Sequence, residues 1–162
     1  MSFFVNAVQG EAFKWVVDYF QGRNIRIQSS NPPSSIIAEF GSWFTMYPGN
    51  AKGNVNAQLM KRDNGTYINL NFDFSSYYAS GLSMGVILSV AAFVFFNLFL
   101  TNVLHTATIP AVLQFYAVAL SFGCVLIMAL GLGYDVSKTR RNFLEEFNMF
   151  IQSLASKKTS LN

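Results

Sequence analysis

Few residues in this chain belong to the types that carry out chemistry. The sequence has one histidine, His105, and one cysteine, Cys124. A single histidine cannot form a two-histidine zinc site, and a single cysteine can form neither an internal disulfide nor a CxxC pair. A Ser-His-Asp triad would need an acidic partner, but no Asp or Glu lies between residues 74 and 134. We therefore expect no metal ion, an ordinary loop histidine, and a cysteine that serves as a small apolar residue in a helix interface.

The remaining candidates for chemistry are two carboxylates and a glycine-containing segment. Glu39 and Asp73 fall on the polar face of an expected sheet, where a carboxylate pair without a cleft is expected to be solvated surface. Gly49 and Gly53 enclose the sequence NAK and match neither a P-loop nor a GxGxxG fingerprint. We expect no catalytic residue and no cofactor, and we interpret the chain as non-enzymatic.

Charge is scarce and unevenly distributed along the chain. Only 12% of the residues are charged and 52% are hydrophobic, whereas an average soluble domain has about 25% charged residues. No Asp, Glu, Lys or Arg occurs from residue 74 to residue 134. This stretch holds two apolar segments, each near the ~20 residues that a helix needs to cross the hydrocarbon of a bilayer. We predict a transmembrane hairpin at residues 79–134, with helices at about 80–101 and 111–133 and an outer loop at 102–110.

The basic residues predict the orientation of this hairpin. Lys138, Arg140 and Arg141 closely follow the second apolar segment, Lys61 and Arg62 precede the first, and the outer loop has no basic residue. By the positive-inside rule, both termini are expected in the cytoplasm. The predicted location is the cell membrane, with membrane lipid as a partner. The basic residues form no stripe or known motif, so we expect no nucleic-acid partner.

Residues 1–78 are predicted to form a small cytoplasmic α+β domain, an antiparallel sheet packed with one helix. Strands are expected at residues 2–8, 24–29 and 35–40, with a turn at Asn31-Pro32-Pro33. A helix is expected at residues 11–21, because apolar residues recur there at helical spacing and Gly22 suits its C-terminal cap. The apolar residues are Phe13, Val16, Val17 and Phe20.

A β-hairpin is the clearest local prediction. Residues 54–61 and 66–74 alternate between polar and apolar types on either side of Asp63-Asn64-Gly65. Asn-Gly favours a type I′ turn with positive φ at both residues. With Asn64 and Gly65 as the turn, Leu59 faces Leu70 on an apolar side. The opposite side carries Asn56, Gln58, Met60, Asn69, Asn71 and Asp73.

The connection before this hairpin, residues 41–53, has the sequence GSWFTMYPGNAKG. We expect its aromatic residues to lie at the depth of the lipid headgroups, since Trp and Tyr rings are part apolar and part polar. The candidates for this membrane interface are Trp43, Phe44, Tyr47, Tyr77 and Tyr78. The alternative is that Trp43 and Phe44 close one end of the domain core.

Residues 135–162 are predicted to form a cytoplasmic amphipathic helix and tail. The sequence GLGY at 131–134 is expected to loosen the preceding helix, and Phe143, Phe147, Phe150, Ile151 and Leu154 then recur at helical spacing. This helix could pack on the sheet domain, on the membrane or on a partner.

Small residues in the hairpin also predict close helix contacts. They form one stripe, Gly81, Gly85, Ser89 and Ala92, and begin another at Ala119 and Gly123. Such stripes would pack the hairpin on itself or against another chain. Asn97 and Gln114 could donate hydrogen bonds across the hairpin or to a partner.

Four short sequences follow one another in the first half of the chain: NPP at 31–33, FGSW at 40–43, GNAKG at 49–53 and NLNFDF at 69–74. In this order they resemble a pattern in a family of small archaeal membrane proteins that join a short α+β domain to a two-helix transmembrane hairpin. The resemblance covers roughly residues 1–80 in motif and the hairpin in layout. The family has no assigned activity, so the resemblance implies this architecture and an archaeal source, and no catalytic residue.

Together these patterns predict an α+β membrane protein that works by binding other proteins, as an accessory subunit of a larger membrane complex. Its partners would be other membrane proteins or further copies of itself. The candidate interaction faces are the polar side of the sheet and the C-terminal helix: Asn56, Gln58, Asn69, Asn71, Phe143, Phe147 and Phe150. The alternative is binding of lipid or a hydrophobic ligand at the cytoplasmic membrane surface.

Overall fold

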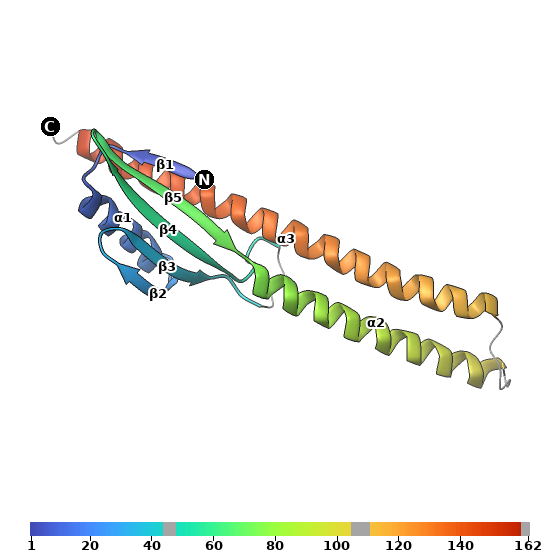
Figure 1. Ribbon diagram of the computed structural model, residues 1–162. Coiled ribbons are helices and arrows are strands. Elements are labelled where there is room, and N and C mark those ends of the chain that lie inside the picture. The colour runs from blue at the N-terminus through green and yellow to red at the C-terminus, as the bar shows by residue number, and fades with distance from the viewer. Residues whose placement is uncertain (44–47, 105–110, 160–162) are drawn as a thin grey trace. The chain divides into compact units, whose positions relative to one another are not determined.

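The computed structural model describes residues 1–43, 48–104 and 111–159, which form an α+β protein (Figure 1). The chain divides into two compact units, one of Met1–Ser75 with Asp135–Asn162 and one of Ser76–Tyr134. The elements in chain order are β1 (Ser2–Val5), α1 (Gln9–Gly22), β2 (Arg26–Asn31), β3 (Ser35–Phe40), β4 (Gly53–Arg62), β5 (Gly65–Asp73), α2 (Ser75–Leu104) and α3 (Ala111–Thr159).

The five strands of the first unit form one antiparallel sheet in the order β1-β5-β4-β3-β2. β3 has the predicted limits, and the two prolines lie in the predicted turn before it, where the Ser34 N–H donates to the Asn31 carbonyl oxygen at 2.8 Å. β1 is shorter than predicted, and β2 begins and ends two residues later than predicted.

The predicted register of the β4–β5 hairpin is wrong by two residues. Leu59 pairs with Ile68 and Arg62 with Gly65, so Asp63 and Asn64 are the two loop residues. Asn24 is the only described non-glycine residue with positive φ, which excludes the predicted type I′ geometry at Asn64. The pairing changed, but every side chain stays on its predicted face, because side-chain direction repeats every two residues along a strand.

Gly65 is required for a different reason from the one predicted. It is the first residue of β5, and a Cβ there would collide with the Val5 carbonyl oxygen and lie 2.9 Å from the Phe4 ring. The close approach of β1 to β5, and not the conformation of a turn, therefore selects glycine at this position.

α1 lies against one face of the sheet through Ala12, Val16, Tyr19 and Phe20, which are all buried. Phe13 and Val17, predicted on the same face, are half-buried at its margin. Gly22 does not take the left-handed conformation that was predicted for the end of this helix. Asn24 does so instead, with φ of 54°, and the Ile25 N–H donates to the Phe20 carbonyl oxygen at 2.8 Å.

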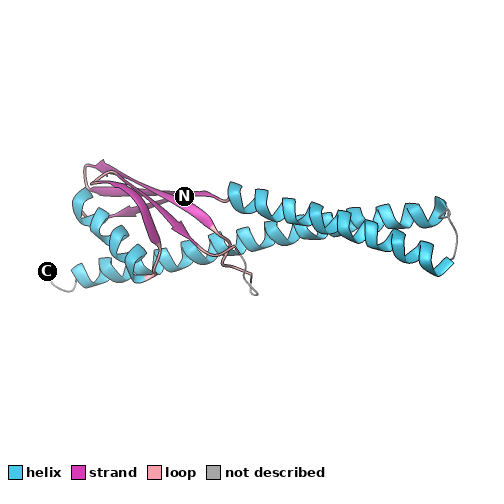
Figure 2. Ribbon diagram, turned by 90° about the horizontal axis from the view of Figure 1, so that it is seen from below, coloured by secondary structure: helices cyan, strands magenta, loops and turns pink. Residues whose placement is uncertain are grey.

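The C-terminal part of α3 covers the same face of the sheet as α1 (Figure 2). Phe147 is fully buried, with ring centroids 5.2 Å from Phe3 and 5.1 Å from Tyr19. Phe143 packs at 5.2 Å against both Phe40 and Phe72. Aromatic rings from the sheet, α1 and α3 thus form one core. The sequence left open whether the C-terminal helix packs on the sheet domain, on the membrane or on a partner, and in the structure it packs on the sheet domain.

The second unit consists of α2 and the N-terminal part of α3. A Cβ at Gly81 would lie 2.6 Å from the Leu132 side chain, and one at Gly85 2.8 Å from the Met128 sulfur. Ser89 Oγ donates to the Ser121 carbonyl oxygen at 3.0 Å. The first predicted stripe of small residues therefore packs the two helices on each other.

Other predictions for the helices have mixed outcomes. Gly123 has open space where a Cβ would stand, and Gln114 and Cys124 are exposed, so the second stripe and the cysteine make no interface within this unit. Asn97 bonds locally, to the Phe93 carbonyl oxygen at 2.8 Å. The helix is not interrupted at residues 131–134, since α3 continues through them.

Replacing Phe147 by alanine should lower the free energy of unfolding of the sheet-containing unit by about 3–5 kcal/mol, because it leaves a cavity beneath the sheet. Unfolding of the full chain in detergent, followed by the fluorescence of Trp15 in α1, measures this change. Met149→Ala is the matched control, since Met149 is 61% exposed two positions away, and it should cost less than about 0.5 kcal/mol. Equal effects of the two changes would contradict the placement of Phe147 in the core.

Candidate interaction surfaces

The face of the sheet opposite α1 and α3 carries an apolar row across three neighbouring strands. Phe4 pairs with Tyr67, and Tyr67 pairs with Met60. The three side chains are 50%, 42% and 53% exposed, and the Phe4 and Tyr67 ring centroids are 5.1 Å apart. We call Phe4, Met60 and Tyr67 the apolar row. The sequence analysis placed Met60 on this face without making it a candidate interaction residue, and it missed the two aromatic residues.

The predicted amide-bearing residues occupy the next positions on this open face. Asn69 pairs with Gln58, and Asn71 pairs with Asn56. Asn71 is exposed and the other three are half-buried. Asn56 Oδ1 is inaccessible to water and has no hydrogen-bond partner among the residues that the structure describes. These four residues, the amide rows, therefore lie together as the sequence predicts.

The next row places Asn54 between Asp73 and Glu39. Lys52 Nζ lies 2.6 Å from Glu39 Oε1, and this contact holds the pKa of the Glu39 carboxyl below its usual range. The Ser75 N–H donates to Asp73 Oδ1 at 2.9 Å and lowers the pKa of that carboxyl. Both carboxylates thus have local partners that favour the ionised form, which is the opposite of what a general acid needs.

The connection between β3 and β4 is attached to α3 through the N–H groups of Gly49 and Ala51. The Gly49 N–H donates to Asp135 Oδ1, and the Ala51 N–H donates to Thr139 Oγ1 at 2.8 Å. Thr139 Oγ1 in turn donates to the Asp135 carbonyl oxygen at 2.8 Å. Asp135 and Thr139 are both buried. These bonds fix the connection beside the residues of α3 that directly follow its apolar segment.

The predicted membrane-interface residues are only partly described. Trp43 is 39% exposed, and Lys52 Nζ lies 4.8 Å from its ring centroid. Tyr77 is buried and Tyr78 is half-buried, so Tyr77 is not a surface residue. Phe44 and Tyr47, and also His105, lie outside the described residues.

The C-terminal helix does not offer the aromatic interaction face that was predicted. Phe143 and Phe147 are buried in the core of the domain, and Phe150 is half-buried with its ring centroid 5.3 Å from Tyr19. Their apolar surface is already used within the chain. Of the two predicted interaction surfaces, the open face of the sheet is therefore the one that remains largely accessible.

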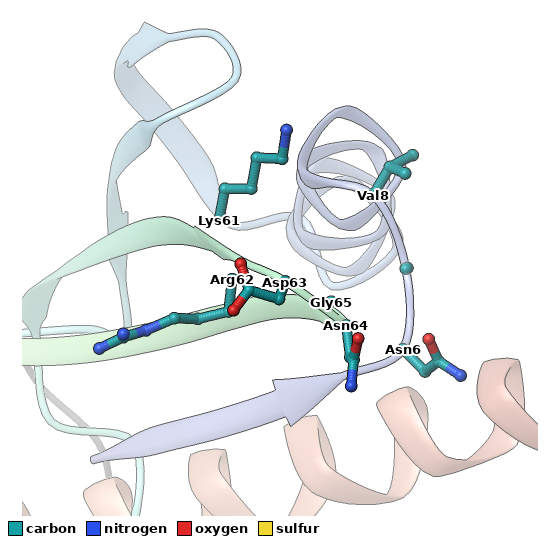
Figure 3. A pocket seen from close by; sticks show the side chains of 8 residues that line it. Asn6, Val8, Lys61, Arg62, Asp63, Asn64 and Gly65 are labelled. Carbon is teal, nitrogen blue, oxygen red and sulfur yellow. The ribbon is translucent and has the colours of Figure 1, made fainter.

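Two hollows of this unit are lined by both polar and apolar surface. One, of about 360 Å³, lies at the β4–β5 turn, and Figure 3 shows Lys61 and Arg62 pointing away from each other at its margin. The other, of about 270 Å³, is bordered by Tyr19 and by an ion pair of 2.9 Å between Arg23 and Glu146. In the described ranges no three His, Cys, Asp or Glu side chains group together as metal ligands would.

Comparison with models of known protein families finds no family that the chain matches, and comparison with curated proteins finds no significant match. The resemblance to archaeal membrane proteins stays a prediction.

Tyr19 provides a test of the packing between α1 and α3. Burial, reinforced by the negative charge of Glu146, raises the pKa of Tyr19 to about 12 from its ordinary value of 10.0. A raised pKa means that the folded state disfavours the ionised form, so this contribution to stability is complete below pH 10 and is lost between pH 10 and 12. We expect Tyr19→Phe to fold and to weaken the decline of stability over that range, as measured by denaturation of the full chain at a series of pH values.

Glu146→Gln serves as the control, because it removes the smaller of the two causes that raise the pKa of Tyr19 and leaves the burial of the ring in place. This variant should narrow the pH range over which stability declines, but a decline should remain. An unchanged pH profile in Tyr19→Phe would show that this side chain is not buried as described.

Proposed function

We propose that this protein is a non-enzymatic, membrane-anchored module that binds another protein through the open face of its sheet, as an accessory subunit of a larger membrane complex. The observation that carries this proposal is the exposed apolar row of Phe4, Tyr67 and Met60. On a half-covered antiparallel sheet the open face is ordinarily polar. Three large apolar side chains in contact across neighbouring strands depart from that rule and are typical of a binding surface.

The amide rows add the polar part of such a surface. Protein interfaces combine an apolar centre with a polar periphery that forms roughly one hydrogen bond per 100–200 Å². Asn and Gln side chains offer both donors and acceptors, so they can pair with a partner's backbone or side chains without a matching charge.

The membrane anchor in this proposal is the pair α2 and α3. Each helix is long and apolar enough to cross a bilayer, and only 6% of its most apolar window is buried. A core helix of a soluble protein would be mostly buried, so the exposed Phe, Leu, Ile and Val side chains of these helices fit contact with lipid better. The segment 76–134, which contains α2 and the apolar part of α3, is joined at both ends to the same compact unit, at Ser75 and at Asp135. An even number of crossings returns the chain to one side, as a hairpin requires.

The proposed orientation rests on the basic residues, with both termini in the cytoplasm and the predicted outer loop, residues 102–110, outside. Trp43 fits the level of the headgroups, because its connection is bonded to Asp135 and Thr139 directly after the apolar part of α3.

Cysteine labelling tests the anchor and its orientation. With Cys124 first changed to serine, a membrane-impermeant thiol reagent applied to intact cells should label a cysteine introduced at Thr106. It should not label one introduced at Asn64 or Ser160 until the membrane is opened, because the bilayer would separate these positions from the reagent. Labelling of Asn64 in intact cells would contradict the orientation, and equal labelling of all three positions would contradict membrane insertion.

Photo-crosslinking tests the binding surface. A photoreactive phenylalanine analogue at Tyr67 of the full chain, in membranes of the native host, should give a discrete protein adduct. The same analogue at Lys14, which is exposed on α1, is the position control and should give none. Met60→Lys should reduce the Tyr67 adduct several-fold, since a charge in the apolar row would have to be desolvated on binding. Adducts with lipid alone, or equal adducts from both positions, would refute the protein-binding role.

A further inference from the structure

An open hollow of about 700 Å³ lies between β1 and one side of α3. The residues of α3 that line it repeat at helical spacing. Three of them, Ser137, Arg140 and Arg141, lie at the end nearest the apolar segment, and Glu145 and Asn148 lie further along. Phe3 and Leu144 provide apolar lining. The hollow therefore combines two guanidinium groups and a hydroxyl group with an apolar wall.

Both arginines are available to bind an anion. The Arg140 guanidinium lies 5.9 Å from the centroid of the Phe72 ring, and no carboxylate in the described part of the chain pairs with it. Arg141 Nε is 3.8 Å from Glu145 Oε1, and the two side chains are 71% and 64% exposed. A long ion pair between exposed groups contributes little, so an incoming anion would displace it at small cost.

The position of these groups along the chain indicates where the anion would come from. Ser137 and Arg141 follow Leu132, near the end of the apolar segment of α3, by five and nine positions. At the helical rise this is about 8 to 14 Å. The headgroup layer of a bilayer begins where the hydrocarbon ends and is roughly 5–7 Å thick on each side. With α3 crossing the membrane, the three groups lie at the phosphates of the cytoplasmic leaflet or just beyond them, within reach of an arginine side chain.

We propose that the hollow lined by Ser137, Arg140 and Arg141 binds the phosphate of an anionic phospholipid. Guanidinium groups match phosphate because they donate paired hydrogen bonds in a fixed plane, and the Arg140 guanidinium also lies over the Phe72 ring. The inference rests on the proposed membrane anchor and specifies which class of membrane lipid the protein binds and where.

Competition between lipids tests this site. The full chain, purified in an uncharged detergent, is mixed with equal amounts of dioctanoyl phosphatidylglycerol and dioctanoyl phosphatidylcholine, and the bound lipid is read by native mass spectrometry. The wild-type chain should retain phosphatidylglycerol preferentially. Changing Arg140 and Arg141 together to glutamine should lower the ratio of the two adducts about tenfold or more, because the charge-assisted hydrogen bonds to the phosphate are lost.

Lys61→Gln with Arg62→Gln is the matched control. It removes the same charge from the hollow at the β4–β5 turn and should leave the adduct ratio unchanged within about twofold. An equal fall in this control would show a general effect of net charge and would overturn the site. Displacement of phosphatidylglycerol by the same concentration of inorganic phosphate would overturn the assignment to lipid. If the double arginine variant does not fold, as judged by circular dichroism, Arg141→Gln alone takes its place, and an unchanged ratio in it overturns the inference.

Thiol labelling of the introduced cysteines in intact cells separates failure of the site from failure of the anchor. If the cysteine at Thr106 is labelled as expected but the chain shows no preference for phosphatidylglycerol, the lipid site is overturned and the membrane anchor is still supported. Labelling that contradicts insertion would overturn both, because the depth argument would then be lost.

Discussion

The fold depends on the burial of Phe143 and Phe147 beneath a sheet whose strands all come from the first half of the chain. α1 alone does not cover the apolar face of five strands, and Phe3, Phe40 and Phe72 meet the aromatic rings of α3. The core is therefore complete only when residues 135–151 are present. A fragment that ends after β5 would expose this face to water, so the domain cannot be expected to fold from its N-terminal half alone.

This constraint also explains why the chain must return after residues 76–134. Both ends of that segment join the same compact unit. The hydrogen bonds from Gly49 and Ala51 to Asp135 and Thr139 fix the point of return, because they attach the β3–β4 connection to the first turn of α3 that belongs to the domain. Gly41, with φ of 76°, has the Ala51 carbonyl oxygen where a Cβ would stand, which brings the two ends of the connection close together.

The parts of the fold that depend only on the spacing of apolar residues, or on the length of an apolar segment, could be predicted from the sequence. The faces of β3, β4 and β5 follow from alternation, and the two long helices follow from length and hydrophobicity. The register of the hairpin could not be predicted, because the choice between two-residue loops depends on how β1 packs against Gly65. The cap of α1 was assigned to Gly22 on propensity, whereas the entry into β2 places the left-handed residue at Asn24. For α3, the spacing of its phenylalanines showed a buried side but not what would bury it.

The candidate surfaces were predictable to a similar degree. The amides of Asn56, Gln58, Asn69 and Asn71 lie on one face because alternation requires it. The apolar row was missed because Phe4, Met60 and Tyr67 each lie in the polar phase of a different strand, and only the pairing of β1 with β5 brings them together. The hollow at Arg140 and Arg141 was not foreseeable, since it needs β1 beside α3, and the sequence contains no local pattern for that contact.

The two free edges of the sheet limit how any further chain could attach to it. β1 offers only four residues, and the pairing of β2 with β3 shifts between Ile27 and Ser29, so that Gln28 is an extra residue that kinks the outer strand. Gln28 also turns its amide inward, toward Glu39 and Asn54 at 3.4 and 3.5 Å. A strand approaching from outside would thus find a short edge on one side and a bent one on the other. Copies of this domain crowded along a surface should consequently resist merging into a continuous sheet, and recognition would be left to side chains on the face.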